Sequence, residues 1–268
     1  MNRLTSRFQN LRRTGRKALI PYITAGDPHP ELTVPMLHKL VQAGADIIEL
    51  GVPFSDPMAD GPVVQKACER ALAQGVSLRQ VLQLVTAFRQ DDADTPLVLM
   101  GYLNPIEAMG YGHFVHAAAE AGVDGVLTVD LPPEEAHDLL TVLGETEIAP
   151  IFLLAPTSSA ERIRQVAAVA KGYVYYVSLK GVTGSASLDV AELDDKIAAI
   201  RALTNLPIGV GFGIKDATTA AAVARTADAV VVGSALVSLM GELANDAQAM
   251  QQAVSAVVAG MRQAMDDV

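Results

Sequence analysis

Tryptophan is absent from this 268-residue chain, cysteine occurs once, and aromatic residues make up only 4%. A single cysteine, Cys68, can form neither an intramolecular disulfide nor a cysteine metal cluster, and it suits the reducing cytoplasm. Uncharged stretches such as 148–160 and 229–241 are 13 residues long, whereas a membrane-spanning helix needs about 18 apolar residues. Because half of the residues are still hydrophobic, we expect a cytoplasmic protein with a large aliphatic core and no membrane partner.

Basic residues are fewer than acidic ones, 20 against 30, and the net charge is −10. Residues 1–17 contribute +6, so the rest of the chain carries −16. An acidic body of this kind argues against nucleic acid as a partner. Within the basic N-terminal segment, Leu4, Phe8 and Leu11 recur at helical spacing, which predicts an amphipathic helix that caps the fold.

Short β-branched runs alternate with Ala- and Leu-rich helical stretches along the whole chain. The strands are expected at 18–24, 46–50, 96–101, 124–128, 148–153, 173–178, 206–210 and 228–232. The helices are expected at 31–43, 78–90, 112–121, 134–144, 159–170, 190–203, 216–225 and 247–264. Eight strand–helix units in about 250 residues predict one α/β domain, a (β/α)8 TIM barrel over residues 1–268.

Two further features bear on this fold. The step from the second strand to the third is 50 residues, so it must hold an extra helix at about 62–74. An open dinucleotide-binding sheet has the same alternation, but segment 209–214 lacks the Gly or Ala that ends the dinucleotide fingerprint. The pattern therefore favours the barrel.

The most informative segment is 48–65, where Glu49 lies in a hydrophobic run and Asp56 and Asp60 follow on a loop rich in Gly and Pro. Acids at the ends of barrel strands are typical of proton-transfer sites. A salt-bridged strand-end acid is the structural alternative for Glu49. Taken alone, Asp60 also fits the N-cap of the inserted helix, and Asp56 fits a turn.

Glycine turns follow the predicted sixth, seventh and eighth strands, at 181–184, 211–213 and 233–235. Exposed N–H groups and helix N-termini on adjacent barrel loops favour a phosphate. Each glycine could instead serve only a tight turn. Three such turns together favour the phosphate site.

Other polar residues allow competing interpretations. Asp130 follows the fourth strand and also faces the reactive end of the barrel. Lys180, after the sixth strand, could form a Schiff base with a carbonyl substrate, although its glycine-rich loop favours a non-covalent role. His113 and His116 share a helical face without a third ligand, so no metal site is expected.

Taken together, these motifs resemble those of the tryptophan synthase alpha chain family, and the resemblance extends from the first helix to the last. The resemblance rests on segments 21–28, 49–62, 130–132, 181–184, 211–214 and 233–235. It implies cleavage of indole-3-glycerol phosphate to indole and glyceraldehyde 3-phosphate by a retro-aldol reaction. It also implies an α2β2 tetramer with a beta chain that consumes the indole, with pyridoxal phosphate only in that partner and no cofactor in this chain.

The resemblance also implies roles for single residues. Glu49 matches the general acid/base, and Asp60 matches the acid that hydrogen-bonds the indole N–H. The substrate-binding positions that match are Tyr22, Met100, Tyr175, Thr183, Gly184, Phe212, Gly213, Gly233 and Ser234, of which Gly184, Gly213, Gly233 and Ser234 match phosphate ligands. Pro53 and Asp56 match the beta-chain interface. Phenylalanine is more usual at position 22 and leucine at position 100.

Three other functions remain open on the residues alone. A sugar-phosphate isomerase of similar barrels would also pair acids at the barrel mouth, and an FMN-binding barrel would use the same glycine loops for its phosphate. A regulatory subunit without activity is disfavoured by the intact Glu49 and Asp60.

Overall fold

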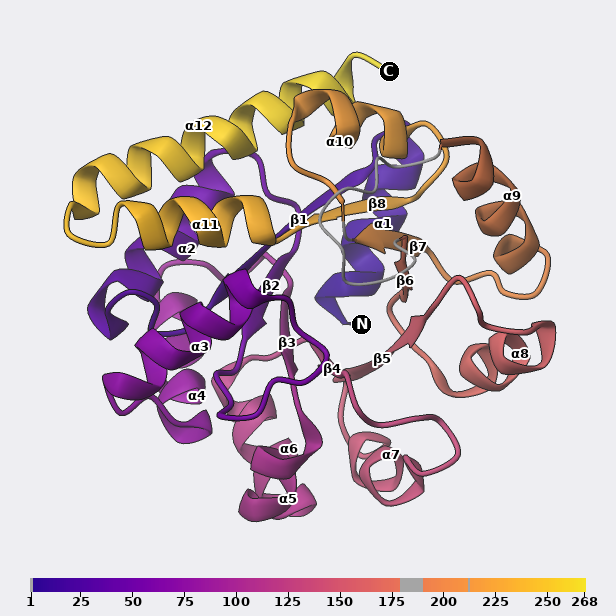
Figure 1. Ribbon diagram of the computed structural model, residues 1–268. Helices are drawn as coiled ribbons and strands as arrows, with labels where there is room; N and C mark the ends of the chain where they lie inside the picture. The colour runs from indigo at the N-terminus through magenta and orange to yellow at the C-terminus, as the bar shows by residue number, and fades with distance from the viewer. Residues whose placement is uncertain (1, 179–189, 212) are drawn as a thin grey trace.

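Eight parallel strands close into a barrel in the computed structural model, which describes residues 2–178, 190–211 and 213–268. The strands are β1 (Ala18–Thr24), β2 (Ile48–Gly51), β3 (Leu97–Gly101), β4 (Gly125–Thr128), β5 (Ala149–Leu154), β6 (Val174–Val177), β7 (Ile208–Gly211) and β8 (Ala229–Val232). Each strand pairs with the next, and β8 pairs with β1. The predicted TIM barrel is confirmed, and helices surround the strands (Figure 1).

The helices in the described ranges are α1 (Arg3–Thr14), η1 (Pro30–Leu32), α2 (Thr33–Gln42), α3 (Pro62–Ala73), α4 (Leu78–Arg89), α5 (Leu103–Met109), α6 (Tyr111–Ala121), α7 (His137–Leu143), α8 (Ala160–Val169), α9 (Val190–Arg201), α10 (Ala217–Ala224), α11 (Ser234–Glu242) and α12 (Ala247–Asp266). None of them is both long enough and apolar enough to cross a membrane. The extra helix expected at 62–74 is α3, so that prediction is confirmed. Helices α5 and α11 were not among the expected ones.

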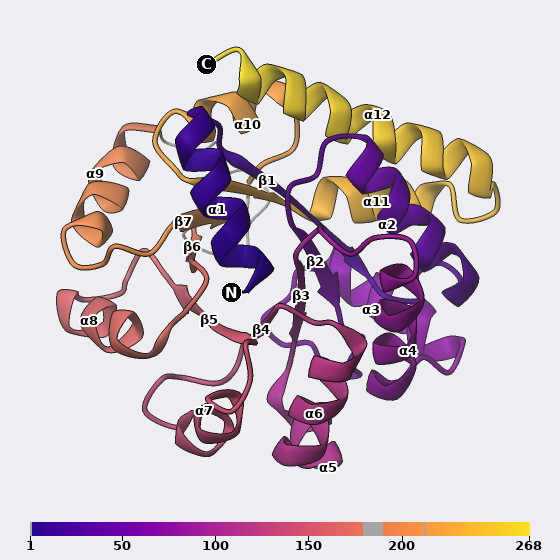
Figure 2. The ribbon, with the colours of Figure 1, turned by 180° about the vertical axis from the view of Figure 1, so that it is seen from behind.

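The N-terminal helix caps the barrel, as its apolar face predicted. Leu4, Phe8 and Leu11 are buried and join the cluster that fills the barrel interior, and the Phe8 ring lies 5.8 Å from that of Tyr173. Figure 2, seen from behind, shows α1 across the end of the barrel. An ion pair between Arg3 and Asp124, with N and O 2.9 Å apart, fastens α1 to the start of β4.

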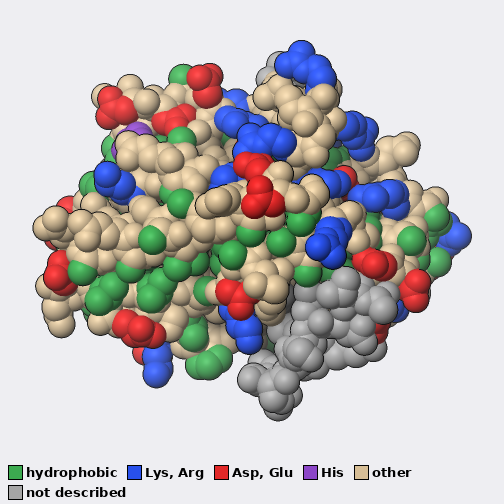
Figure 3. Space-filling model, turned by 90° about the horizontal axis from the view of Figure 1, so that it is seen from above, with side chains coloured by type: hydrophobic (Ala, Val, Ile, Leu, Met, Phe, Trp, Pro, Cys, Tyr) green, Lys and Arg blue, Asp and Glu red, His purple; other side chains and the backbone are tan. Residues whose placement is uncertain are grey.

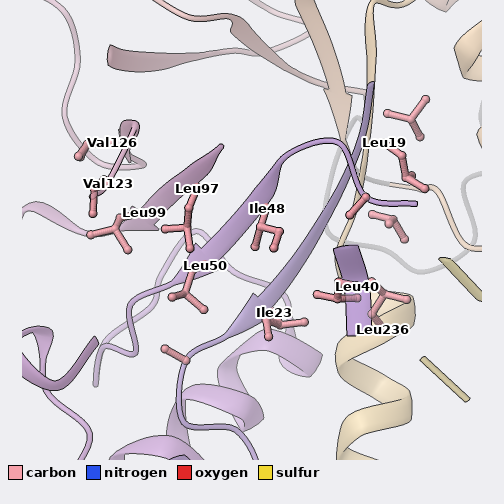
Figure 4. Packing of buried hydrophobic residues seen from close by; sticks show 14 of the residues in the cluster. Leu19, Ile23, Leu40, Ile48, Leu50, Leu97, Leu99, Val123, Val126 and Leu236 are labelled. Atoms are coloured by element: carbon pink, nitrogen blue, oxygen red, sulfur yellow. The ribbon is translucent and has the colours of Figure 1, made fainter. Parts of the chain in front are cut away.

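A second and larger apolar layer lies between the strands and the surrounding helices. Figure 4 shows its members from β1, β2 and β3 with Leu40 of α2 and Leu236 of α11. Alternate residues of each strand point outward into this layer, and the residues between them point into the barrel. Leu19 and Ile23 therefore face outward on β1, which leaves Ile20 and Tyr22 facing inward.

The outer surface carries the charge that the core excludes. On the face over α12 and α10, basic and acidic side chains are interspersed, and the residues shown in colour form no extended area of one sign there (Figure 3). A charged pair is buried beneath α12. Arg262, 7% exposed, donates to Asp46 and to the Lys17 carbonyl oxygen, both at 2.9 Å, and so ties α12 to the beginnings of β1 and β2.

Candidate active site

Glu49 is fully buried inside the barrel, and within the described part of the chain it has one hydrogen-bond partner. It is the second residue of β2, which ends at Gly51 and is thus shifted toward the C-terminus relative to the expected strand 46–50. The Tyr173 hydroxyl donates to Oε1, whereas Oε2 has no partner among the described residues. Burial raises the pKa of Glu49 to about 7, although the Tyr173 hydrogen bond opposes the rise.

The salt-bridge alternative for Glu49 is therefore not what the structure shows, because no lysine or arginine in the described ranges pairs with it. A carboxyl with a pKa near neutral can both give and take a proton at physiological pH. Such a perturbed acid inside a barrel is a strong candidate for a catalytic group.

Large tyrosines fit beside Glu49 because neighbouring strands carry glycine at the facing positions. A Cβ on Gly51 would lie 2.2 Å from the Tyr22 hydroxyl oxygen, and a Cβ on Gly211 would lie 1.9 Å from that of Tyr175. Both distances are far below van der Waals contact, so these two positions require glycine. Tyr22 is the register partner of Glu49 across β1 and β2, and its hydroxyl shares a 3.3 Å hydrogen bond with Thr24.

Asp60 lies on the loop between β2 and α3, at the same end of the barrel. The Tyr102 hydroxyl donates to its Oδ2 at 2.9 Å. Burial raises the pKa of Asp60, and the Tyr102 hydrogen bond opposes that rise. The N-cap role considered for Asp60 is wrong, because Gly61 is the N-cap of α3 and no side chain caps that helix end.

The wall beside Tyr22 comes from α3 and α11. Val64, Ala67 and Cys68 of α3 form one buried cluster with Tyr22 and Val237, and Met100 of β3 packs against it. Cys68 thus lies on a helix as a small apolar residue, as expected. Tyr22, Met100 and Tyr175 all face the barrel interior, so these three predicted substrate-binding side chains lie together there.

Within the described ranges, the predicted phosphate residues lie at the ends of β7 and β8. Gly213 has a φ of +76°, a conformation that favours glycine. Gly233 is the N-cap of α11, and Ser234 is the first residue of that helix. A Cβ on Gly233 would lie 3.4 Å from the Tyr22 ring. The N–H groups at the start of α11 therefore lie next to the wall of the tyrosine-lined site, where an anion is favoured.

A family model for the tryptophan synthase alpha chain matches residues 8–266. The chain belongs to the tryptophan synthase alpha chain family. A tryptophan synthase alpha chain of Thioalkalivibrio sulfidiphilus is 65% identical over 266 residues, which cover 99% of this chain and 100% of the relative. That of Marinobacter nauticus is 60% identical over 268 residues, 100% of this chain and 99% of the relative.

Solved structures agree with this assignment. The tryptophan synthase subunit alpha of Legionella pneumophila strain Paris superposes with a TM-score of 0.93 at 47% identity, covering 100% of both chains. The alpha chains of this family are lyases of tryptophan biosynthesis that cleave indole-3-glycerol phosphate and pass the indole to the beta subunit.

Several residues singled out from the sequence lie outside the described ranges, so the structure does not place them. They are Lys180, Thr183, Gly184 and Phe212, together with the turn at 181–184. Of the two residues matched to the interface, Pro53 is buried, whereas Asp56 is exposed and accepts from the Ser55 hydroxyl at 2.5 Å. Met58 on the same loop is 85% exposed.

Asp130 follows the C-terminal end of β4, and its Oδ1 accepts from the Leu103 N–H at 2.8 Å, at the first residue of α5. No group of three or more His, Cys, Asp or Glu in the described ranges is placed to hold a metal ion.

Two tyrosines of this site were not predicted from the sequence: Tyr173, which bonds Glu49, and Tyr102, which bonds Asp60. For Tyr173 a signal existed, because it is two residues before Tyr175 and alternate strand residues share a face. Tyr102 follows β3 and gave no such signal, since its partner Asp60 is 42 residues away.

Proposed function

We propose that this protein cleaves indole-3-glycerol phosphate to indole and glyceraldehyde 3-phosphate, with Glu49 and Asp60 as its two catalytic carboxylates. The observation that carries the proposal is a pair of acids in unlike surroundings at one end of the barrel, with Glu49 fully buried and Asp60 half-buried. Glu49 has one oxygen without a partner, and Asp60 is held by a tyrosine. Two carboxyl groups whose environments differ can divide acid–base and electrostatic roles.

In the proposed reaction, Glu49 in its acid form gives a proton to the indole ring carbon that bears the side chain. It then accepts the proton of the adjacent side-chain hydroxyl. The carbonyl forms as the carbon–carbon bond breaks, and the electron pair of that bond returns to the ring. The two proton transfers cancel, so Glu49 ends as it began, and its pKa of about 7 suits both steps.

Asp60 has an electrostatic role in this proposal. Protonation of the ring carbon leaves positive charge on the indole nitrogen, and an anionic Asp60 that accepts a hydrogen bond from that N–H stabilises it. In a site shielded from water, an oriented charge of this kind is worth more than it would be in water.

The substrate is held at its two ends. Tyr22, Met100 and Phe212 lie around the indole ring in this proposal, and Tyr175 and Thr183 are further substrate-binding residues. The phosphate binds at Gly184, Gly213, Gly233 and Ser234, where the α11 N-terminus supports the assignment. Anchoring the phosphate away from the reacting bond supplies binding energy that orients the indole.

The alpha-chain family implies a beta-chain partner. We propose that residues 1–268 form a single domain that assembles with this beta chain as an α2β2 tetramer in the cytoplasm. Pro53 and Asp56 lie at the interface in this proposal. This chain needs no cofactor for the cleavage, and pyridoxal phosphate belongs to the beta partner.

The test is release of indole from indole-3-glycerol phosphate by the purified chain, with and without a beta chain. Glu49→Gln keeps the shape of the side chain but removes proton transfer, so it should lower the rate by about 10²–10⁴-fold. Asp60→Asn should also be severely impaired. Glu120→Gln on the exposed surface of α6 is the matched control and should behave as the parent. Absence of indole with the parent chain and its beta partner would refute the proposal.

A further inference from the structure

One phenol group connects two parts of the loop between β2 and α3. Tyr102 follows β3, is 4% exposed, and makes two hydrogen bonds through its hydroxyl. It donates to Asp60 Oδ2 at 2.9 Å and accepts from the Ala59 N–H at 3.0 Å. The side chain of Asp60 and the backbone beside it are therefore held by the same oxygen atom.

The Tyr102 ring is itself held in place. Its centroid lies 5.2 Å from that of Phe54, with 30° between the ring planes. On its N-terminal side, the Val52 N–H donates to the Met100 carbonyl oxygen at 2.8 Å, and on its C-terminal side the Leu103 N–H donates to Asp130. With the backbone tied on both sides, the hydroxyl has little freedom to leave Asp60.

We infer that Tyr102 is a positioning residue that keeps the Asp60 carboxylate anionic and aimed at the ring nitrogen of the substrate. The inference rests on the proposed function and adds a residue to it. Tyr102 does not touch the reacting atoms in this account, and it acts through the hydrogen bond to Asp60.

The surroundings of Asp60 explain why such a donor is needed. Besides Tyr102, the titratable groups that face it are Tyr22 of β1, Cys68 of α3 and Tyr175 of β6. None of these is a cation, and no described lysine or arginine forms an ion pair with Asp60. Burial favours the neutral acid, so a hydrogen bond to the charged form is what opposes protonation.

Tyr102→Phe removes the hydroxyl and keeps the ring against Phe54. A hydrogen bond to a charged group corresponds to about one to two pKa units, so the pKa of Asp60 should rise by about that much. Titration of 13C-labelled aspartate carboxyls by NMR, with the Asp60 signal assigned from its loss in Asp60→Asn, measures this directly. The indole-release rate at neutral pH should fall about tenfold or more, while the melting temperature stays close to that of the parent.

Tyr111→Phe is the matched control. The Tyr111 hydroxyl also donates to a carboxylate, Glu107 Oε1, at 2.9 Å, but on the exposed surface of α5 and α6. Losing that bond should change neither the Asp60 titration nor the rate. If Tyr102→Phe leaves both at parental values, the inference is overturned.

A double-mutant comparison separates positioning from a general effect on folding. If Tyr102 acts through Asp60, adding Tyr102→Phe to Asp60→Asn should cost little further activity, whereas fully additive losses would overturn the inference. The NMR titration needs no substrate. A parent chain that releases no indole would therefore refute the proposed function, and the titration would still decide whether Tyr102 controls Asp60.

Discussion

Replacing Glu49 by glutamine should make this protein more stable at neutral and alkaline pH while removing its activity. In the folded chain the pKa of Glu49 is raised by burial to about 7, against an ordinary value of 4.5. Ionising Glu49 at neutral pH therefore costs more free energy in the folded protein than in the unfolded chain. At about 1.4 kcal/mol per pKa unit, the difference corresponds to about 3 kcal/mol above pH 7.

The direction with pH follows from proton binding. Between pH 4.5 and about 7 the folded protein retains a proton on Glu49 that the unfolded chain has released. The contribution of this group to stability is therefore fully present below pH 4.5 and is lost as the pH rises to about 7. Glutamine does not titrate, and its side-chain oxygen can still accept from the Tyr173 hydroxyl.

Urea unfolding followed by circular dichroism, on parent and Glu49→Gln at pH 5.5 and 8.5, measures the effect. The free energy of unfolding of the variant relative to the parent should increase by about 2 kcal/mol between the two pH values, since part of the change occurs below pH 5.5. The other titrating groups are common to both proteins and largely cancel. An equal difference at both pH values would show that Glu49 does not have a raised pKa in the fold, and its assignment as a neutral-pH acid would fail.

Two further substitutions test the framework around the site. Arg262→Met removes the buried partner of Asp46 and should lower the free energy of unfolding by about 3–5 kcal/mol in urea titrations; a loss below about 1 kcal/mol would show that the pair is not needed. Gly211→Ala places a Cβ against the Tyr175 hydroxyl and should cost about 1–3 kcal/mol together with most of the indole release. Gly112→Ala in α6, where a Cβ meets no atom within 4 Å, should do neither, and equal effects of the two changes would contradict the packing argument.

Alternation along the chain was enough to predict the barrel, because each strand–helix unit carries its own periodicity. All eight strands lie within two residues of their expected starts, and α1 and α3 were also predicted. Helix α5 was not predicted, because Pro105 interrupts its short sequence. The first N–H of this helix donates to Asp130, which lies on the loop after β4. Proline is tolerated in a first turn, but sequence pattern alone does not show which distant side chain completes the helix end.

For the site, too, the sequence and the tertiary structure decide different things. The sequence by itself determined which residue types occupy the strand ends, and the family resemblance assigned Glu49 and Asp60 among them. Only the tertiary structure decided their surroundings: the partner of Glu49 is 124 residues away and that of Asp60 is 42 residues away. A pKa depends on burial and on neighbours in space. The raised pKa of Glu49 and the hold of Tyr102 on Asp60 therefore arise only once the barrel has closed and brought distant strands together.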